Sequence, residues 1–114
     1  MNDKPFECDA TALQDQLNES IGHRARVECV ERLTSTNAVL KRDALESHDT
    51  FLLAGQQSLG VGRRGSVWQS PAEGNLYLSY CFHTETSLAD LSLLPLAFAL
   101  AIADRVESEW AIDV

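Results

Sequence analysis

The sequence predicts an α+β fold with a mixed sheet, in which helices and strands alternate along the chain. Segments with apolar residues at helical spacing alternate with segments in which apolar and polar residues alternate singly. Their order is helix, strand, helix, strand, loop, strand, helix. The chain has 114 residues, 45% of them hydrophobic, which fits one domain with a buried core.

A first helix is predicted over residues 9–21, because Leu13 and Leu17 mark one apolar face. Thr11 and Gln14 have the spacing of a capping box at its start, and a glycine follows its end.

The next three elements alternate between strand and helix. Residues 26–33 alternate between apolar and polar side chains, which favours a strand. Residues 34–37 have the composition of a helix cap, and a modest apolar stripe predicts a helix over 38–45. A short apolar run at 51–54 indicates a second strand.

The rest of the chain begins with a long predicted loop over residues 55–75, which contains five glycines. Loops of this length within a domain are usually functional or mobile. Clean alternation predicts a strand over 76–82. A helix is predicted over 90–109, with Pro95 in its first turn and an apolar face that includes Leu96.

The charge of the chain excludes some classes of protein. Its net charge is −8, with 17 acidic and 9 basic residues, which disfavours general nucleic-acid binding. Charges and a proline interrupt the longest apolar stretch, 88–106, which disfavours a membrane span. Residues 1–8 do not have the apolar core of a signal peptide, so we expect a cytoplasmic protein without a membrane segment.

The three cysteines, Cys8, Cys29 and Cys81, are odd in number and far apart, and none belongs to a CxxC pair. We interpret them as reduced thiols, as expected in the cytoplasm. The histidines show no ligand spacing, and no metal site is predicted.

The long loop contains a Gly-x-Gly-x-x-Gly pattern from Gly60 to Gly65, which is also found in dinucleotide-binding folds. In those folds a helix begins at the third glycine, whereas here Ser66 to Gly74 cannot form a helix of useful length. The dinucleotide-binding motif also does not have two neighbouring arginines between its glycines, as this sequence does at Arg63 and Arg64. We therefore reject a dinucleotide-binding fold.

The side chains of this loop favour a ligand that has a phosphate and flat rings. Glycines let backbone N–H groups surround an anion, and Arg63 and Arg64 can hold a phosphate through two hydrogen bonds. Trp68 offers a flat surface for a ring, and Gln57 offers both an acceptor and a donor to an amide-like or ureido group.

Residues 57–70 (QSLGVGRRGSVWQS), followed by Pro71 and by residues 74–79 (GNLYLS), closely resemble the signature of biotin protein ligases. Residues 35–37 (STN), at a predicted strand-to-helix junction, are similar to the second signature of that family. The resemblance extends from Val27 to about Trp110.

The resemblance implies a catalytic domain of the class II aminoacyl-tRNA synthetase and biotin ligase type. It implies that biotin and ATP, with Mg²⁺, give biotinyl-5′-adenylate and pyrophosphate. The activated biotin then passes to a lysine of a biotin carboxyl carrier domain, such as that of acetyl-CoA carboxylase. The family also allows a homodimer formed through sheet edges.

The resemblance further implies roles for individual residues. Contacts with biotin are expected from Ser35, Thr36, Asn37, Gln57, Gly60, Val61, Gly62 and Arg63. Arg63 should also reach the phosphate of the adenylate, which makes it the expected catalytic residue. Ordering of the loop over the adenylate is expected from Arg64, Gly65 and Trp68.

The sequence departs from the family at several points. The family usually has arginine where Val61 stands, and often also at Ser66. Its next landmark, a Lys-Trp-Pro-Asn-Asp segment whose lysine stabilises charge during adenylation, does not follow within the chain. No helix-turn-helix precedes the catalytic part. We therefore expect residues 1–114 to be the N-terminal portion of the catalytic domain, truncated, and weak or inactive alone.

Two other functions remain open. The chain can be a non-catalytic fragment that binds biotin or adenylate, or a degenerate module that associates with other subunits. It can also be a relative of the lipoate ligases, although their corresponding loop reads differently. Each motif also has a purely structural interpretation when taken alone, since Ser35-Thr36-Asn37 suits a helix cap and Trp68 a core aromatic. Their joint occurrence favours the ligase.

Overall fold

The computed structural model describes residues 6–21, 25–42, 49–72 and 74–113. The chain divides into two compact units, Met1–His83 and Thr84–Val114. The first contains a sheet with two helices and the second contains one long helix.

The first unit is built on a three-stranded mixed sheet in the order β1-β2-β3. Strand β1 (Ala25–Leu33) runs parallel to β2 (Asp49–Gln57), and β3 (Tyr77–Cys81) runs antiparallel to β2. This confirms the predicted α+β fold with a mixed sheet.

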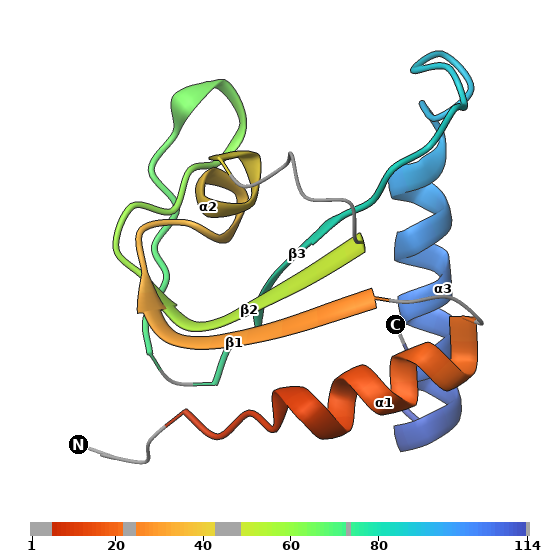
Figure 1. Ribbon diagram of the computed structural model, residues 1–114, viewed down its shortest axis with the longest axis horizontal. Helices are drawn as coiled ribbons and strands as arrows, with labels where there is room; N and C mark the ends of the chain where they lie inside the picture. The colour runs from red at the N-terminus through yellow and green to blue at the C-terminus, as the bar shows by residue number, and fades with distance from the viewer. Residues whose placement is uncertain (1–5, 22–24, 43–48, 73, 114) are drawn as a thin grey trace. The chain divides into compact units, whose positions relative to one another are not determined.

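Helices α1 (Ala10–Ile21) and α2 (Thr36–Arg42) lie against opposite faces of the sheet (Figure 1). A cavity of about 350 Å³ between α1 and the sheet is lined by Phe51 and Leu53, so odd positions of β2 face α1. Even positions therefore face the other way, and they are the more deeply buried: Leu52 is 1% exposed and Ala54 is fully buried.

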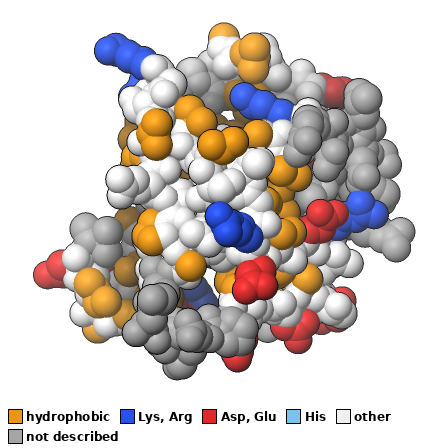
Figure 2. Space-filling view, turned by 90° about the vertical axis from the view of Figure 1, so that its left-hand side faces the viewer, with side chains coloured by type: hydrophobic (Ala, Val, Ile, Leu, Met, Phe, Trp, Pro, Cys, Tyr) orange, Lys and Arg blue, Asp and Glu red, His pale blue; other side chains and the backbone are white. Residues whose placement is uncertain are grey.

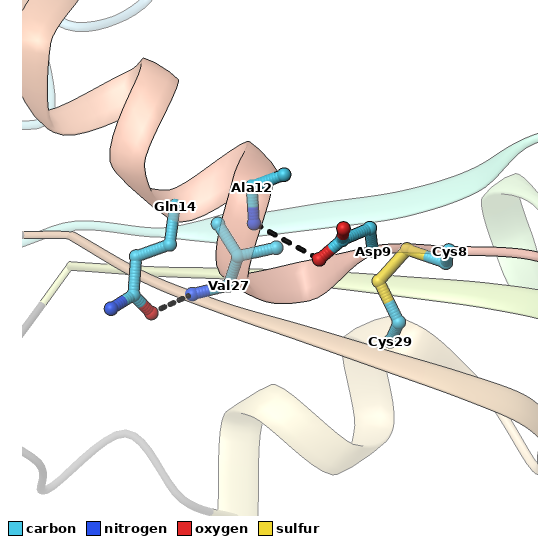
Figure 3. Close-up of a disulfide and its surroundings, with 6 residues drawn as sticks. All are labelled: Cys8, Asp9, Ala12, Gln14, Val27 and Cys29. Carbon is cyan, nitrogen blue, oxygen red and sulfur yellow. Dashed lines mark hydrogen bonds between the residues drawn. A yellow bond between two sulfur atoms is a disulfide. The ribbon is translucent and has the colours of Figure 1, made fainter.

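The predicted first helix is confirmed, but its cap differs from the prediction. The Asp9 carboxylate accepts a hydrogen bond from the Ala12 N–H at 3.0 Å, as an N-cap residue does. Gln14, which was expected to complete a capping box, instead accepts a hydrogen bond from the Val27 N–H of β1 at 3.0 Å (Figure 3). The side-chain amide of Gln14 therefore bonds to the sheet and does not cap the helix. The predicted end of this helix, Gly22, lies outside the described residues.

The cysteines correct another prediction. Cys8 and Cys29, expected to be reduced, form a disulfide between the segment before α1 and β1 (Figure 3). Their Cα atoms lie 5.9 Å apart because this segment runs beside the strand, and the sequence separation of 21 residues concealed the pairing. Cys81 is free. Disulfides are rare in cytosolic proteins, so the cysteines no longer support the cytoplasmic expectation.

Strand β2 is longer than predicted at its carboxyl end. The prediction stopped at residue 54, but pairing with β1 continues to Gln57, which lies opposite Leu33. Gly55 therefore belongs to the strand and not to the loop. A Cβ at Gly55 would lie 2.7 Å from the Phe6 ring, so glycine allows close packing here. The extension places Gln57 at the end of a rigid strand.

Helix α2 begins two residues before the predicted 38, at Thr36. Ser35 caps it, because the Ser35 carbonyl accepts a hydrogen bond from the Val39 N–H at 3.0 Å and its hydroxyl lies 3.4 Å from the Ala38 nitrogen. The predicted end of the helix, at residue 45, lies outside the described residues.

In the second unit, residues 90–93 form turns, so α3 (Leu94–Trp110) begins later than the predicted residue 90. Pro95 lies in its first turn, as predicted. The predicted buried face is wrong for Leu96, which is 61% exposed, because α3 is the only helix or strand in the described part of this unit. None of the helices in the described part of the chain is long and apolar enough to cross a membrane.

Candidate functional site

A pocket of about 250 Å³ lies where β1 and β2 end and α2 begins. It is lined by Ser35, Thr36, Asn37, Gln57, Val61, Trp68, Leu76, Tyr77, Leu78 and Ser79. Ligands commonly bind beyond the carboxyl ends of parallel strands, where backbone groups and helix N-termini are available. Figure 2 views this end of the chain, where hydrophobic side chains protrude in the upper half beside basic ones.

The Gln57 side chain makes hydrogen bonds at the pocket through both its oxygen and its nitrogen. Its Oε1 accepts a hydrogen bond from the Thr36 backbone N–H at 2.8 Å, and its Nε2 donates to Ser70 Oγ at 3.1 Å. Because a backbone N–H can only donate, the Gln57 carboxamide has a defined orientation. Gln57 therefore connects the first turn of α2 to the segment that follows the glycine-rich loop.

Three polar side chains meet on the α2 side of the sheet. Thr36 Oγ1 lies 2.6 Å from Ser79 Oγ, and Ser79 Oγ donates to Asn37 Oδ1 at 2.5 Å. Thr36 and Ser79 are buried, whereas Asn37 is exposed. The site thus has buried hydroxyls beneath a carboxamide that a ligand can reach.

Two backbone hydrogen bonds fix the start of the glycine-rich loop. The Ser58 N–H donates to the Leu33 carbonyl at 2.9 Å, and the Leu59 N–H donates to the Thr34 carbonyl at 2.8 Å. These bonds continue the parallel pairing of β1 and β2 into the turn before α2. The loop therefore leaves the sheet from a fixed position beside the pocket.

Residues 60–68 form a small hairpin, which we call the glycine hairpin; it lies beside α2 in Figure 1. The Trp68 N–H donates to the Gly60 carbonyl at 2.8 Å, and Val61 and Val67 form an antiparallel bridge. At the tip, Arg64 and Gly65 have positive φ angles of 59° and 75°. The prediction of a loop is correct here, although the loop has more internal structure than expected.

Gly60 has no room for a side chain. A Cβ there would lie 2.7 Å from both Ser70 Oγ and the Trp68 carbonyl, and 3.2 Å from Gln57 Nε2. The carbonyl belongs to the backbone and cannot move easily. Gly60 therefore allows the hairpin to pack directly on the Gln57–Ser70 pair.

The exposed side chains of the hairpin include both apolar and basic residues. Val61 is 66% exposed and Trp68 is 61% exposed, although both line the pocket. Arg63 and Arg64 are exposed and do not line it. Exposed apolar side chains at a pocket entrance are available to cover a ligand.

The structure brings six of the predicted site residues to one pocket: Ser35, Thr36, Asn37, Gln57, Val61 and Trp68. Gly60 lies behind Gln57, and Gly62 packs against the Trp68 ring, which would lie 3.4 Å from a Cβ at residue 62. Arg63, Arg64 and Gly65 form the exposed tip of the hairpin and are not brought to the pocket.

The sequence assigned no role to two residues that the structure places in the polar network, Ser70 and Ser79. Both are serines within segments that resembled the family signature, so only the motif itself could have indicated them. Tyr77 contributes differently, because its hydroxyl donates to the Pro71 carbonyl at 2.8 Å and holds the turn before β3.

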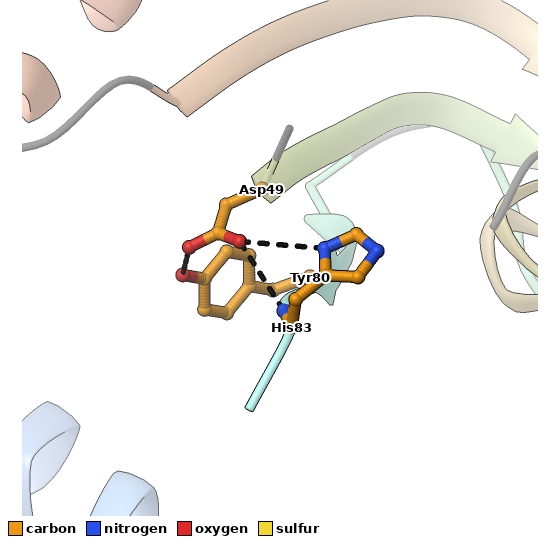
Figure 4. A network of polar contacts seen from close by, with 3 residues as sticks. All are labelled: Asp49, Tyr80 and His83. Atoms are coloured by element: carbon orange, nitrogen blue, oxygen red, sulfur yellow. Dashed lines mark hydrogen bonds and ion pairs between the residues drawn. The ribbon is translucent and has the colours of Figure 1, made fainter. Parts of the chain in front are cut away.

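A second polar cluster lies at the other end of the sheet (Figure 4). The Tyr80 hydroxyl donates to Asp49 Oδ2 at 3.0 Å, and His83 Nδ1 lies 3.8 Å from Asp49 Oδ1. Desolvation by burial, followed by the hydrogen bond to the Asp49 carboxylate and its charge, raises the pKa of Tyr80 to about 12. Tyr80 also stacks on Phe51 with a centroid distance of 4.0 Å. This cluster ties the ends of β2 and β3 together.

The described residues contain no group of three or more His, Cys, Asp or Glu side chains that could hold a metal ion. The groups that the candidate pocket does offer are hydroxyls, carboxamides and backbone amides. These suit a ligand that carries neutral polar groups.

Comparison with known protein families matches residues 29–111 to the family described as biotin/lipoate A/B protein ligases. A search of curated proteins finds no match to this chain. The matched segment includes the whole pocket and the glycine hairpin.

Proposed function

Because the chain belongs to the biotin/lipoate A/B protein ligase family, we propose that it is part of a biotin protein ligase. In the proposed reaction, a carboxylate oxygen of biotin attacks the α-phosphorus of ATP and pyrophosphate leaves. The amino group of an acceptor lysine then attacks the acyl carbon of biotinyl-5′-adenylate, AMP leaves, and the lysine nitrogen loses a proton.

The observation that carries this proposal is the polar lining of the pocket. Thr36, Asn37 and Gln57 meet in a pocket of about 250 Å³ and offer hydroxyl and carboxamide groups. The ureido group of biotin carries two N–H donors and a carbonyl acceptor, which such groups can pair. The dithiolane ring of lipoate has no N–H and only weak acceptors, so it would leave these groups unpaired.

The glycine hairpin is the proposed site of adenylate binding. Arg63 and Arg64 are its exposed cations, and a guanidinium holds a phosphate through two parallel hydrogen bonds. In the proposed closed state, Arg63 turns toward the adenylate phosphate and Val61 and Trp68 cover the ligand. We propose that Mg²⁺ arrives with ATP as a counter-ion of its phosphates.

Covering the ligand has a chemical purpose in this proposal. Biotinyl-5′-adenylate is a mixed anhydride that water hydrolyses, and an ordered apolar hairpin would exclude water until the acceptor lysine arrives. The proposed acceptor is a biotin carboxyl carrier domain of a carboxylase such as acetyl-CoA carboxylase. A homodimer remains part of the proposal, because β1 and β3 are edge strands of the described sheet.

A calorimetric titration tests the proposed function. The chain is titrated with biotin, with lipoate, and with a non-hydrolysable mimic of biotinyl-5′-adenylate, and the Arg63→Ala variant is titrated in parallel. Saturable binding of biotin but not lipoate supports the proposal, as does weaker binding of the mimic by the variant with unchanged binding of biotin. Binding of lipoate in preference to biotin would overturn it.

A binding fragment without turnover is the second candidate, and the exposed position of Arg63 outside the pocket favours it. A fragment of this kind binds biotin but forms no adenylate. Incubation of the chain with biotin and ATP, followed by measurement of released pyrophosphate, distinguishes the two candidates.

A further inference from the structure

Ser79 is a buried hydroxyl that sits beneath the two pocket residues at the start of α2. It lies in β3, opposite Leu52 of β2, and is 9% exposed. Its oxygen lies 2.6 Å from Thr36 Oγ1 and 2.5 Å from Asn37 Oδ1. One side chain therefore contacts two residues that line the pocket.

The hydrogen atoms of this group follow from which of its atoms can donate. The Asn37 carboxamide places its oxygen, Oδ1, 2.5 Å from Ser79 Oγ, within the usual range of O–H···O hydrogen bonds. A carboxamide oxygen can only accept, so the single hydrogen of the Ser79 hydroxyl points to Asn37.

The acceptor of the Thr36 hydroxyl hydrogen is then also determined. Two hydroxyl oxygens 2.6 Å apart need a hydrogen between them, and Ser79 has none left to give. Thr36 therefore donates to Ser79. Its hydroxyl then has no hydrogen left for Gln57 Oε1, 3.2 Å away, and that oxygen is held by the Thr36 backbone N–H instead. The hydrogen bonds run in one direction, from Thr36 to Ser79 to Asn37.

This direction determines what the pocket offers to a ligand. Thr36 Oγ1 has given its hydrogen to Ser79, so toward the pocket it can only accept. Asn37 has its oxygen occupied, and its amide nitrogen makes no hydrogen bond with the described residues, so it can only donate. A ligand that pairs with both groups must place a donor opposite Thr36 and an acceptor opposite Asn37, as the N–H and the carbonyl of a ureido group do.

We propose that Ser79 is a positioning residue that selects a ureido-bearing substrate, because its hydrogen bonds with Thr36 and Asn37 fix one as acceptor and the other as donor. This inference rests on the proposed function, since it assumes that biotin occupies the pocket. It adds that Ser79, which itself lines the pocket, acts through its hydrogen bond to Asn37, by preventing the carboxamide of that residue from flipping.

The test compares biotin with 2-iminobiotin at neutral pH, where a protonated C=NH₂⁺ group, which can only donate, replaces the ureido carbonyl. The whole chain and its Ser79→Ala variant are titrated with both compounds. We expect the unchanged chain to prefer biotin by about 10-fold, the equivalent of one hydrogen bond. In Ser79→Ala the Asn37 carboxamide is free to turn, so the ratio of the two affinities should fall close to one. Ser79→Thr, which keeps the hydroxyl, should restore the preference.

Thr50→Ala is the matched control, because Thr50 is a buried threonine of the same sheet that does not line the pocket. It should leave the ratio of affinities unchanged. A purely structural role of Ser79 would lower both affinities equally, so a Ser79→Ala variant that keeps the ratio overturns the inference while the proposed function stands. An unchanged chain that binds neither compound, or only lipoate, overturns the proposed function and the inference with it.

If the Ser79→Ala variant does not fold, the Asn37→Asp variant tests the assigned direction of the hydrogen bonds instead. Asn37 is exposed, so this substitution does not disturb the core, and it replaces the donor with an acceptor of the same size. The preference should then reverse in favour of 2-iminobiotin. An Asn37→Asp variant that still prefers biotin by the original factor would refute the assigned direction.

Discussion

The Thr36 backbone N–H donates to Gln57 Oε1 at 2.8 Å and so links the first turn of α2 to the end of β2. The first four N–H groups of a helix have no partner within the helix, and Gln57 satisfies one of them. One side chain therefore stabilises the fold and shapes the pocket.

Replacing Gln57 with alanine should affect both stability and binding. The Thr36 N–H and Ser70 Oγ each lose a partner, so we expect the free energy of unfolding to fall by about 1–3 kcal/mol. Biotin affinity should fall by about 10-fold or more because Thr36 is no longer held. Urea unfolding followed by circular dichroism and calorimetric titration measure the two effects. The neighbouring Gln56→Ala is the control, and equal losses in both variants would contradict the assigned role.

Gly60→Ala should be much more harmful than Gly62→Ala. A methyl group at Gly60 would meet the Trp68 carbonyl at 2.7 Å, whereas at Gly62 the nearest atom lies at 3.4 Å, an ordinary contact. We expect Gly60→Ala to lower the free energy of unfolding by about 1–3 kcal/mol and Gly62→Ala to change it little. Thermal melting of the two variants provides the comparison. Equal melting temperatures would show that the hairpin does not pack as described.

Trp68 should report ligand binding through its fluorescence. Trp68 lines the pocket but is 61% exposed, so a bound ligand will change its surroundings. The other tryptophan, Trp110, lies in the second unit. In a Trp110→Phe background, biotin should shift the emission, and in a Trp68→Phe background it should not. A shift that persists without Trp68 would place the binding site elsewhere.

The raised pKa of Tyr80 predicts that the free energy of unfolding falls at high pH. Its pKa is raised from 10.0 to about 12 in the folded chain, so the folded state holds the phenol proton more tightly than the unfolded state. This contribution is fully present below pH 10 and is lost as the pH rises toward about 12. Urea midpoints measured across this range should fall less steeply in Tyr80→Phe. Tyr77→Phe serves as the control and should keep the steeper fall.

Reduction of the Cys8–Cys29 disulfide should destabilise the first unit. The bond closes a loop of 21 residues in sequence separation, and its loss should lower the free energy of unfolding by about 2–4 kcal/mol. Melting with and without dithiothreitol measures the change. A Cys8→Ser/Cys29→Ser variant should match the reduced chain and show no further response, whereas Cys81→Ser should behave like the unchanged chain. If reduction leaves the melting temperature unchanged, the bond does not stabilise the fold.

Much of the fold could be predicted because its signals are local. Periodicity located all three described strands and three helices, and hydrogen bonding of Ser35 agrees with the predicted cap. The end of β2 could not be predicted, because Gly55 suggests a loop until pairing with β1 is known. Gln14 has the spacing of a cap, but the strand beside it takes its amide.

The candidate site was also predictable only in part, because some of its residues are brought together by pairing between strands that the sequence does not reveal. The pocket residues at the ends of β1 and β2 belong to recognisable motifs, and the structure brings them together. Ser79 lies 42 residues from Asn37 in sequence, and only the register of β3 against β2 places it beneath α2. The disulfide between Cys8 and Cys29 likewise depends on tertiary packing that no spacing rule reveals.

The two backbone bonds at Ser58 and Leu59 mark the point where the chain passes from the sheet to the hairpin. Ser58 and Leu59 donate to the carbonyls of Leu33 and Thr34, whereas the backbone bonds of residues 60–68 lie within the hairpin, which contacts the Gln57–Ser70 pair through Gly60. Residues that recognise the ligand are therefore separate from residues that cover it. Substitutions at the hairpin tip can change how long a ligand stays bound while its recognition is preserved, so residence time and selectivity can evolve independently in this chain.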